Sequence, residues 1–169
     1  VEIAADIWDM FLTMDHEKPL ERDTVLMVQH WNLYLNKNLK TMSMTDQEWK
    51  NQLSDEEYHI LREKGTEPPH SGKYNTHFED GKYHCKGCGA LLFDSASKFE
   101  SNCGWPSFDS SVEGAIEYKK DSSLGMMRVE ILCSNCGGHI GHIFDDGPTE
   151  TGKRYCVNSI SINFKNQDS

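Results

Sequence analysis

Two short cysteine pairs constrain this chain more than any other feature of its sequence. Cys85 and Cys88 stand in "CKGC", Cys133 and Cys136 stand in "CSNC", and glycine follows each pair. A C-x-x-C turn can direct two sulfurs at one ion, and a tetrahedral zinc ion accepts four thiolates. The pairs therefore predict one structural Zn2+ that joins two distant turns and keeps no open position for catalysis. Two local disulfides, or cysteines that have lost a ligand role, are the alternatives.

The chain divides into two parts of different character. Residues 1–45 lack cysteine and glycine, and their apolar residues recur every three or four positions, which predicts an N-terminal helical extension. Five of the seven methionines lie there, either as packing residues or as targets of oxidation. Capping-box patterns begin at Thr45 and Ser54, and the second predicts a short helix that Gly65 closes. An extended linker, "EPPHSGKY", follows.

The second part, residues 46–169, is expected to be one mainly β domain with short helices before the β core. From Tyr74 onward, short apolar or alternating stretches such as "GKYHC" and "MMRVEILC" are separated by Gly, Asn, Asp and Ser. This pattern is typical of antiparallel strands.

Charge and hydropathy exclude two classes of partner. The formal net charge is −10, and the basic residues are scattered, which argues against binding to nucleic acid. No apolar run approaches the roughly 20 residues that span a bilayer, so no membrane partner is expected. We expect an intracellular, cytoplasmic protein; an organellar targeting segment upstream of Val1 stays open.

The stretch "GKRYCVNSISINF" (152–164) poses the main functional question. As one strand it places Arg154, Cys156 and Asn158 on the same face, followed by apolar side chains. A nucleophilic thiol needs positive charge or hydrogen-bond donors nearby, which an arginine and an asparagine can supply. The alternative is an ordinary half-buried strand with a solvated arginine.

Two other motifs carry residues suited to chemistry. "GHIGHIF" contains His139 and His142, which can exchange protons near neutral pH but share one site only if Gly141 bends the strand. "NCGWPSF" (102–108) places Cys103 in a loop suited to a resolving thiol. Its Trp105 and Phe108 form either an apolar substrate wall or plain core packing.

Together, "CKGCGALLF", "KFESNCGWPSF", "VEILCSNCGGHIGHIF", "DDGP" and "GKRYCVNSISINF" resemble the methionine-R-sulfoxide reductase B family from about Leu53 to Phe164. The resemblance implies a fold of two antiparallel sheets, a β-tent, and reduction of the R epimer of methionine sulfoxide, mainly in proteins. It departs at His70, where an aromatic or apolar residue is expected.

The resemblance also implies a role for each residue. Cys156 would attack the sulfoxide sulfur, with Arg154 favouring its thiolate. His139, His142 and Asn158 would bind the sulfoxide oxygen, while Trp105 would hold the ε-methyl group. The resulting Cys156 sulfenic acid would react with Cys103 to form a disulfide, which thioredoxin would reduce. A catalytically silent zinc-binding module and another thiol oxidoreductase are the rival hypotheses.

Overall fold

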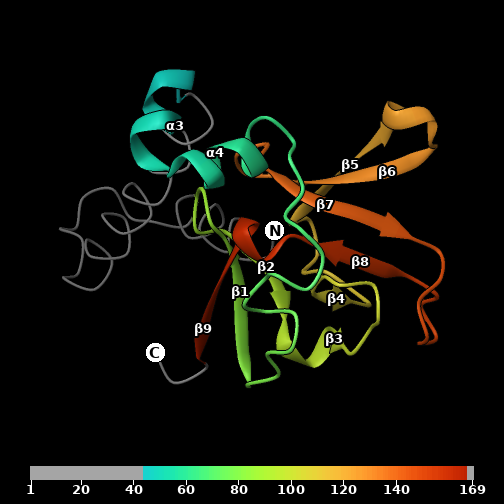
Figure 1. Ribbon diagram of the computed structural model, residues 1–169. Coiled ribbons are helices and arrows are strands. Elements are labelled where there is room, and N and C mark those ends of the chain that lie inside the picture. The colour runs from blue at the N-terminus through green and yellow to red at the C-terminus, as the bar shows by residue number, and fades with distance from the viewer. Residues whose placement is uncertain (1–43, 167–169) are drawn as a thin grey trace, which may run out of the picture. The chain divides into compact units, whose positions relative to one another are not determined.

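Figure 1 shows the computed structural model of the chain, which describes residues 44–166. The helical extension predicted over residues 1–45 lies almost wholly outside the described residues. At its end, Met44 is partly buried and packs against the core. Among the described residues, no helix is both long and apolar enough to cross a membrane.

Two short helices precede the strands, as the capping patterns predict. Helix α3 spans Asp46–Gln52 and α4 spans Asp55–Leu61, and both begin with a complete capping box, at Thr45 with Glu48 and at Ser54 with Glu57. Gly65 closes the turn that follows the second helix, since its N–H donates to the carbonyl of His59 in the last turn at 3.0 Å. Helix α4 already ends at Leu61, and Lys64 takes the left-handed conformation, with φ of 62°.

The strands form two antiparallel sheets. The smaller sheet has the order β2-β1-β9 and the larger one β3-β4-β8-β7-β6-β5 within residues 44–166 (Figure 1). The bounds are β1 Gly81–Cys85, β2 Leu91–Asp94, β3 Lys98–Phe99, β4 Ser107–Phe108, β5 Ile116–Asp121, β6 Arg128–Cys133, β7 His139–Phe144, β8 Arg154–Val157 and β9 Ile162–Asn166. The mainly β fold of two antiparallel sheets is therefore confirmed.

The core lies between the two sheets. The Phe93 ring from β2 stacks on Phe108 from β4, with centroids 4.4 Å apart, and Tyr83 from β1 meets Phe108 edge-on at 5.0 Å. All three side chains are fully buried. Aromatic contacts between strands of different sheets thus fix the position of β4 and of the loop before it.

The stretch 152–164 is not one strand, as its alternation had indicated. A 3-10 turn, η3 (Ser159–Ser161), separates β8 from β9, and these two strands belong to different sheets. Ile160 therefore does not continue the face that carries Cys156. The buried Glu67 carboxylate accepts hydrogen bonds from the backbone N–H groups of Ser159 and Ile160, which stabilises this turn.

Candidate active site and metal centre

The four cysteines of the C-x-x-C pairs form one cluster. Their sulfur atoms all lie within 4.8 Å of one another. The Sγ atoms of Cys85 and Cys136 are 3.7 Å apart, and those of Cys88 and Cys133 are 3.6 Å apart. A tetrahedron of Zn–S bonds near 2.3 Å would place sulfurs about 3.8 Å apart, so the cluster fits such an ion.

The two turns have matching backbone geometry. Gly89 N–H donates to the Cys85 carbonyl and Gly137 N–H to the Cys133 carbonyl, both at 2.8 Å. Both glycines have positive φ, near 78° and 67°, a region that side chains with a Cβ rarely adopt. The glycine after each pair therefore allows the tight turn. None of the six cysteines of the chain forms a disulfide.

The remaining cysteines meet at a second site. The Sγ atoms of Cys103 and Cys156 are 3.8 Å apart. Cys156 lies in the middle of the larger sheet, opposite His142 on β7 and opposite Ser107 on β4. The loop before β4 thus brings Cys103 to a strand that is far away in sequence.

The two thiols share their charge unequally. The hydrogen bond with Cys156, together with those from Ser101 and Ser107, lowers the pKa of Cys103 to about 4. The hydrogen bond with Cys103 and then burial raise the pKa of Cys156, whereas Arg154 opposes this rise. The two opposite shifts have one cause, the contact between the thiols, so the pair shares the first negative charge and resists a second.

Arg154 is held beside the pair by an acidic partner. Its Nε and one terminal nitrogen each donate to a carboxylate oxygen of Asp146 at 2.8 Å. The guanidinium also lies over the Phe144 ring, 4.6 Å from its centroid. A bidentate pair of this kind fixes the direction of the positive charge.

A bulge brings the two histidines together. Ile131 of β6 pairs with Gly141 and the next residue, Leu132, pairs with His139, so Ile140 is an extra residue in β7. The histidine rings are 5.5 Å apart in an edge-on arrangement. A Cβ on Gly141 would lie 2.0 Å from the Cys156 carbonyl oxygen, which explains why glycine is required at the bend.

A small pocket opens beside Cys156. It has a volume of about 110 Å3 and is lined by Thr66, Trp105, Arg128, Gly141, His142, Phe144, Cys156, Val157 and Asn158. The Trp105 indole donates to the Glu67 carbonyl at 3.1 Å, which orients the ring. Asn158 is buried, and its amide bonds the Glu67 N–H and the Ile140 carbonyl, so it holds the linker and β7 in place.

Phe108 is not part of this pocket. Its side chain is fully buried and stacks on Phe93 in the core. The prediction that Phe108 forms an apolar substrate wall is therefore wrong, and core packing, the alternative, is what the structure has. The reason is that Phe108 follows Ser107 on β4, so its side chain projects to the opposite face of the sheet from that of Ser107.

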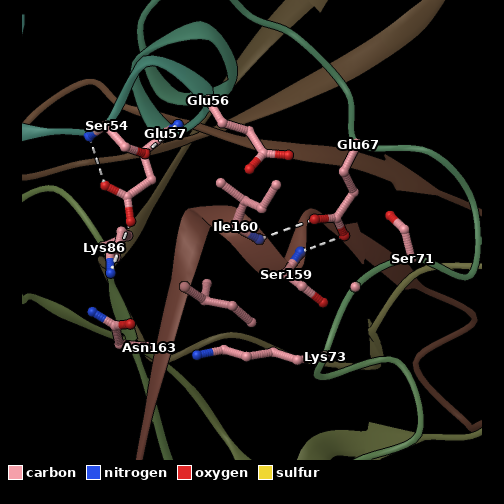
Figure 2. A pocket seen from close by; sticks show the side chains of 12 residues that line it. Ser54, Glu56, Glu57, Glu67, Ser71, Lys73, Lys86, Ser159, Ile160 and Asn163 are labelled. Carbon is pink, nitrogen blue, oxygen red and sulfur yellow. Dashed lines mark hydrogen bonds and ion pairs between the residues drawn. The ribbon is translucent and has the colours of Figure 1, made fainter.

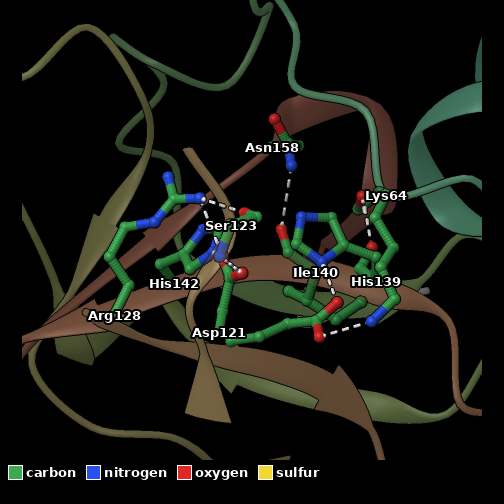
Figure 3. A network of polar contacts seen from close by, with 10 residues as sticks. Lys64, Asp121, Ser123, Arg128, His139, Ile140, His142 and Asn158 are labelled. Carbon is green, nitrogen blue, oxygen red and sulfur yellow. Dashed lines mark hydrogen bonds and ion pairs between the residues drawn. The ribbon is translucent and has the colours of Figure 1, made fainter. Parts of the chain in front are cut away.

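Several polar residues around the histidines could not be predicted from the sequence. Figure 3 shows this network, in which His142 Nε2 lies 2.8 Å from an Asp121 oxygen that Arg128 also contacts at 2.8 Å. His139 Nδ1 lies 2.8 Å from the carboxylate of Glu130, a buried residue. The only signal in the sequence is that Arg128 and Glu130 alternate with apolar residues on one strand.

Comparison with known proteins adds an independent finding. A family model described as the SelR domain matches residues 53–166. The chain is 50% identical to a peptide methionine sulfoxide reductase MsrB of Methanosarcina barkeri, over 76% of this chain and 92% of that protein. It is 52% identical to the MsrB of Variovorax paradoxus, over 72% and 93% of the two chains.

A third relative and a solved structure complete the comparison. The peptide methionine sulfoxide reductase MsrB of Leptospira interrogans is 50% identical, over 75% of this chain and 97% of that protein. The crystal structure of a Mis18 'Yippee-like' domain covers 52% of this chain and 96% of its own, with a TM-score of 0.41 and 18% identity. That likeness is too low to bear on fold or function.

Proposed function

The chain belongs to the methionine-R-sulfoxide reductase B family, the SelR-domain proteins, and on this premise we propose that it reduces methionine sulfoxide to methionine. The observation that carries the proposal is the pair of sulfurs, Cys103 and Cys156, 3.8 Å apart beside a pocket that His142 and Trp105 line. We take the substrate to be the R epimer, mainly within proteins and peptides.

In the first step the Cys156 thiolate attacks the sulfoxide sulfur. The sulfoxide oxygen takes up a proton with the help of His139 and His142, the S–O bond to the substrate breaks, and the oxygen passes to Cys156 as a sulfenic acid. Methionine leaves as the two-electron reduced product. Asn158 belongs to the polar side of this site, while Trp105 contacts the substrate's ε-methyl group.

The charge on the thiol pair has to move before this attack. The Sγ atoms are 3.8 Å apart, so Cys156 can pass its proton to Cys103 and become the thiolate. Arg154 favours this transfer because its guanidinium lowers the pKa of Cys156. Substrate binding beside Cys156 would thus draw the charge to the attacking sulfur.

In the second step Cys103 attacks the sulfenic sulfur of Cys156. A disulfide forms between the two residues, and the hydroxyl leaves as water with one proton. A dithiol protein of the thioredoxin type then donates two electrons and restores both thiols. The short distance between the sulfurs supports the resolving role of Cys103, since little movement is needed to form the bond.

The four-cysteine cluster is proposed to hold one structural zinc ion. Cys85, Cys88, Cys133 and Cys136 would all be ligands, so the ion would lack an open position and would take no part in the reduction. A zinc ion bound there would join the turn after β1 to the turn after β6. We further propose that residues 46–169 form the reductase domain, that residues 1–45 are a separate extension, and that the protein acts in the cytoplasm on oxidised proteins.

Stereospecific turnover tests the proposed reaction. With dithiothreitol as reductant, the wild-type protein should reduce R-methionine sulfoxide and leave the S epimer unchanged, whereas Cys156→Ser should reduce neither. A Cys156→Ser variant with wild-type activity would refute the assignment. A wild-type protein that binds zinc but never turns over would instead favour the rival, a catalytically silent zinc module.

A second variant isolates the resolving step. Cys103→Ser should still release about one methionine per protein molecule in a single turnover, because the attack on the sulfoxide needs only Cys156. With thioredoxin as the sole reductant its steady-state rate should collapse. Normal thioredoxin-supported turnover in this variant would exclude Cys103 as the resolving thiol.

A further inference from the structure

Each of the two histidines faces a carboxylate, but through different ring nitrogens. His139 meets Glu130 through Nδ1, at 2.8 Å, whereas His142 meets Asp121 through Nε2, also at 2.8 Å. Figure 3 shows His142 beside Asp121 and Arg128, and His139 on the side of Lys64. The two rings are thus held in different ways, and the free nitrogen of His139 is its Nε2.

Glu130 is an unusual carboxylate for a β-sheet. Its side chain is only 4% exposed, and Lys64 donates to its second oxygen at 2.7 Å. A charge so deeply buried is tolerated only where partners replace water. Lys64 and His139 are those partners, and together they lower the pKa of Glu130 against the effect of burial. Glu130 is therefore a carboxylate anion at neutral pH.

An anionic Glu130 determines which nitrogen of the neutral His139 ring carries hydrogen. A carboxylate can only accept, so Nδ1 donates, and Nε2 of the neutral ring presents its lone pair. Among the described residues, His139 Nε2 is buried and has no hydrogen-bond partner. A buried polar atom without a protein partner is rare in folded proteins, and a ligand or an ordered water is what can satisfy it.

We propose that Glu130 is a positioning residue for the reduction: it holds Nδ1–H of His139 and favours the protonated ring, whose Nε2–H is then the donor offered to the sulfoxide oxygen, directly or through water. Lys64 is the counter-ion that keeps Glu130 anionic and in place. This inference rests on the proposed function and adds two residues to it that contact neither substrate nor the reacting sulfurs.

The charges around His139 predict opposite effects for the two residues. Burial lowers the pKa of His139, Glu130 opposes this, and His142 on the same strand and Lys64 lower it further. Neutralising Glu130 removes the group that favours the protonated ring, so the pKa of His139 falls. Neutralising Lys64 removes a repulsive charge, so the pKa of His139 rises.

Ring-nitrogen NMR on the full-length reduced protein, labelled with 15N-histidine, tests the arrangement without any substrate. The His139 signals are assigned by their loss in His139→Gln. In the wild type the neutral ring should be the Nδ1–H form. Glu130→Gln should move the titration midpoint to lower pH and mix the two neutral forms, whereas Lys64→Met should move it to higher pH. Glu113→Gln and Lys82→Met, both exposed and with Lys82 on β1 of the smaller sheet, should change neither.

Single-turnover kinetics then tests the link to the reaction. Glu130→Gln should slow methionine release roughly tenfold at neutral pH, as expected for loss of one charged hydrogen bond. The loss of rate at alkaline pH should begin at lower pH in Glu130→Gln and at higher pH in Lys64→Met. Damage to the fold alone would not shift the alkaline loss of rate in opposite directions in the two variants.

Three results would overturn the proposal. One is a wild-type His139 with hydrogen on Nε2 in its neutral form. Another is a titration midpoint of His139 that stays in place, or moves in the same direction, in Glu130→Gln and Lys64→Met. The third is a Glu130→Gln protein that has the expected ring change but the wild-type rate and pH profile. If the wild type fails to reduce sulfoxide, the function is refuted, and the ring measurement still decides the role of Glu130 in holding His139.

Discussion

Glu67 offers the sharpest test of how the site is held together, because its backbone and its side chain both bind residues around the pocket. Its backbone N–H donates to Asn158 and its carbonyl accepts from Trp105. Its carboxylate, in a residue only 2% exposed, accepts from the N–H groups of Ser159 at 2.7 Å and Ile160 at 3.1 Å. Figure 2 shows these last two bonds. Replacing Glu67 by alanine removes only the carboxylate bonds.

The expected loss of stability follows from the two backbone donors left without a partner. Each unsatisfied buried group costs about 1–3 kcal/mol, which gives about 2–6 kcal/mol for the pair. A polar pocket of about 340 Å3 lies next to Glu67, so water can replace part of the lost bonding. We therefore expect Glu67→Ala to lower the free energy of unfolding by about 3 kcal/mol and the Tm by about 10 °C.

Chemical denaturation and thermal melting of the full chain measure this effect. Glu56→Ala is the matched control, since Glu56 lines the same pocket but is exposed. It should melt within about 2 °C of the wild type. Equal losses in the two variants, or a Glu67→Ala protein as stable as the wild type, would refute the reasoning.

The pH dependence of this contribution has a definite sign. Burial raises the pKa of Glu67 above its ordinary value, against the hydrogen bonds from Ser159 and Ile160. A carboxyl group with a raised folded-state pKa contributes most below its unfolded pKa, and the contribution falls as pH rises through the folded value. The stability of the wild type relative to Glu67→Gln should therefore decline from about pH 4 towards neutrality. If the stability of the wild type relative to Glu67→Gln instead rises from pH 4 to neutrality, burial does not raise the pKa of Glu67.

Three further predictions concern the metal centre, the bulge and the core. Removing metal with a strong chelator should release one zinc per chain and lower the Tm by more than 10 °C, because two turns lose their shared ion; a chelated protein with an unchanged Tm would exclude a structural ion. Gly141→Ala should abolish reductase activity, since its Cβ would lie 2.0 Å from the Cys156 carbonyl oxygen; activity above half of the wild-type value would show that the bulge tolerates a side chain. Phe108→Leu should cost about 1–2 kcal/mol in unfolding experiments; a raised KM with unchanged stability would return Phe108 to the substrate site.

Local patterns in the sequence were sufficient for several elements. The capping boxes at Thr45 and Ser54 depend on residues three positions apart, so the helix starts could be predicted and are confirmed. The four-cysteine cluster could be predicted because C-x-x-C spacing is itself a local geometric property. The same local reasoning failed at residues 152–164, where alternation continues through a turn that Glu67, distant in sequence, stabilises.

The sequence by itself determined the type of the elements, the mainly β class, the four cysteines suited to one metal ion and the family. Only the tertiary structure decided which side chains meet. A side chain's neighbours across a sheet depend on register and bulges, which depend on contacts between residues far apart in the chain. That is why Phe108 lies in the core, why the bulge at Gly141 joins His139 to His142, and why Glu130 and Lys64 come to stand behind His139.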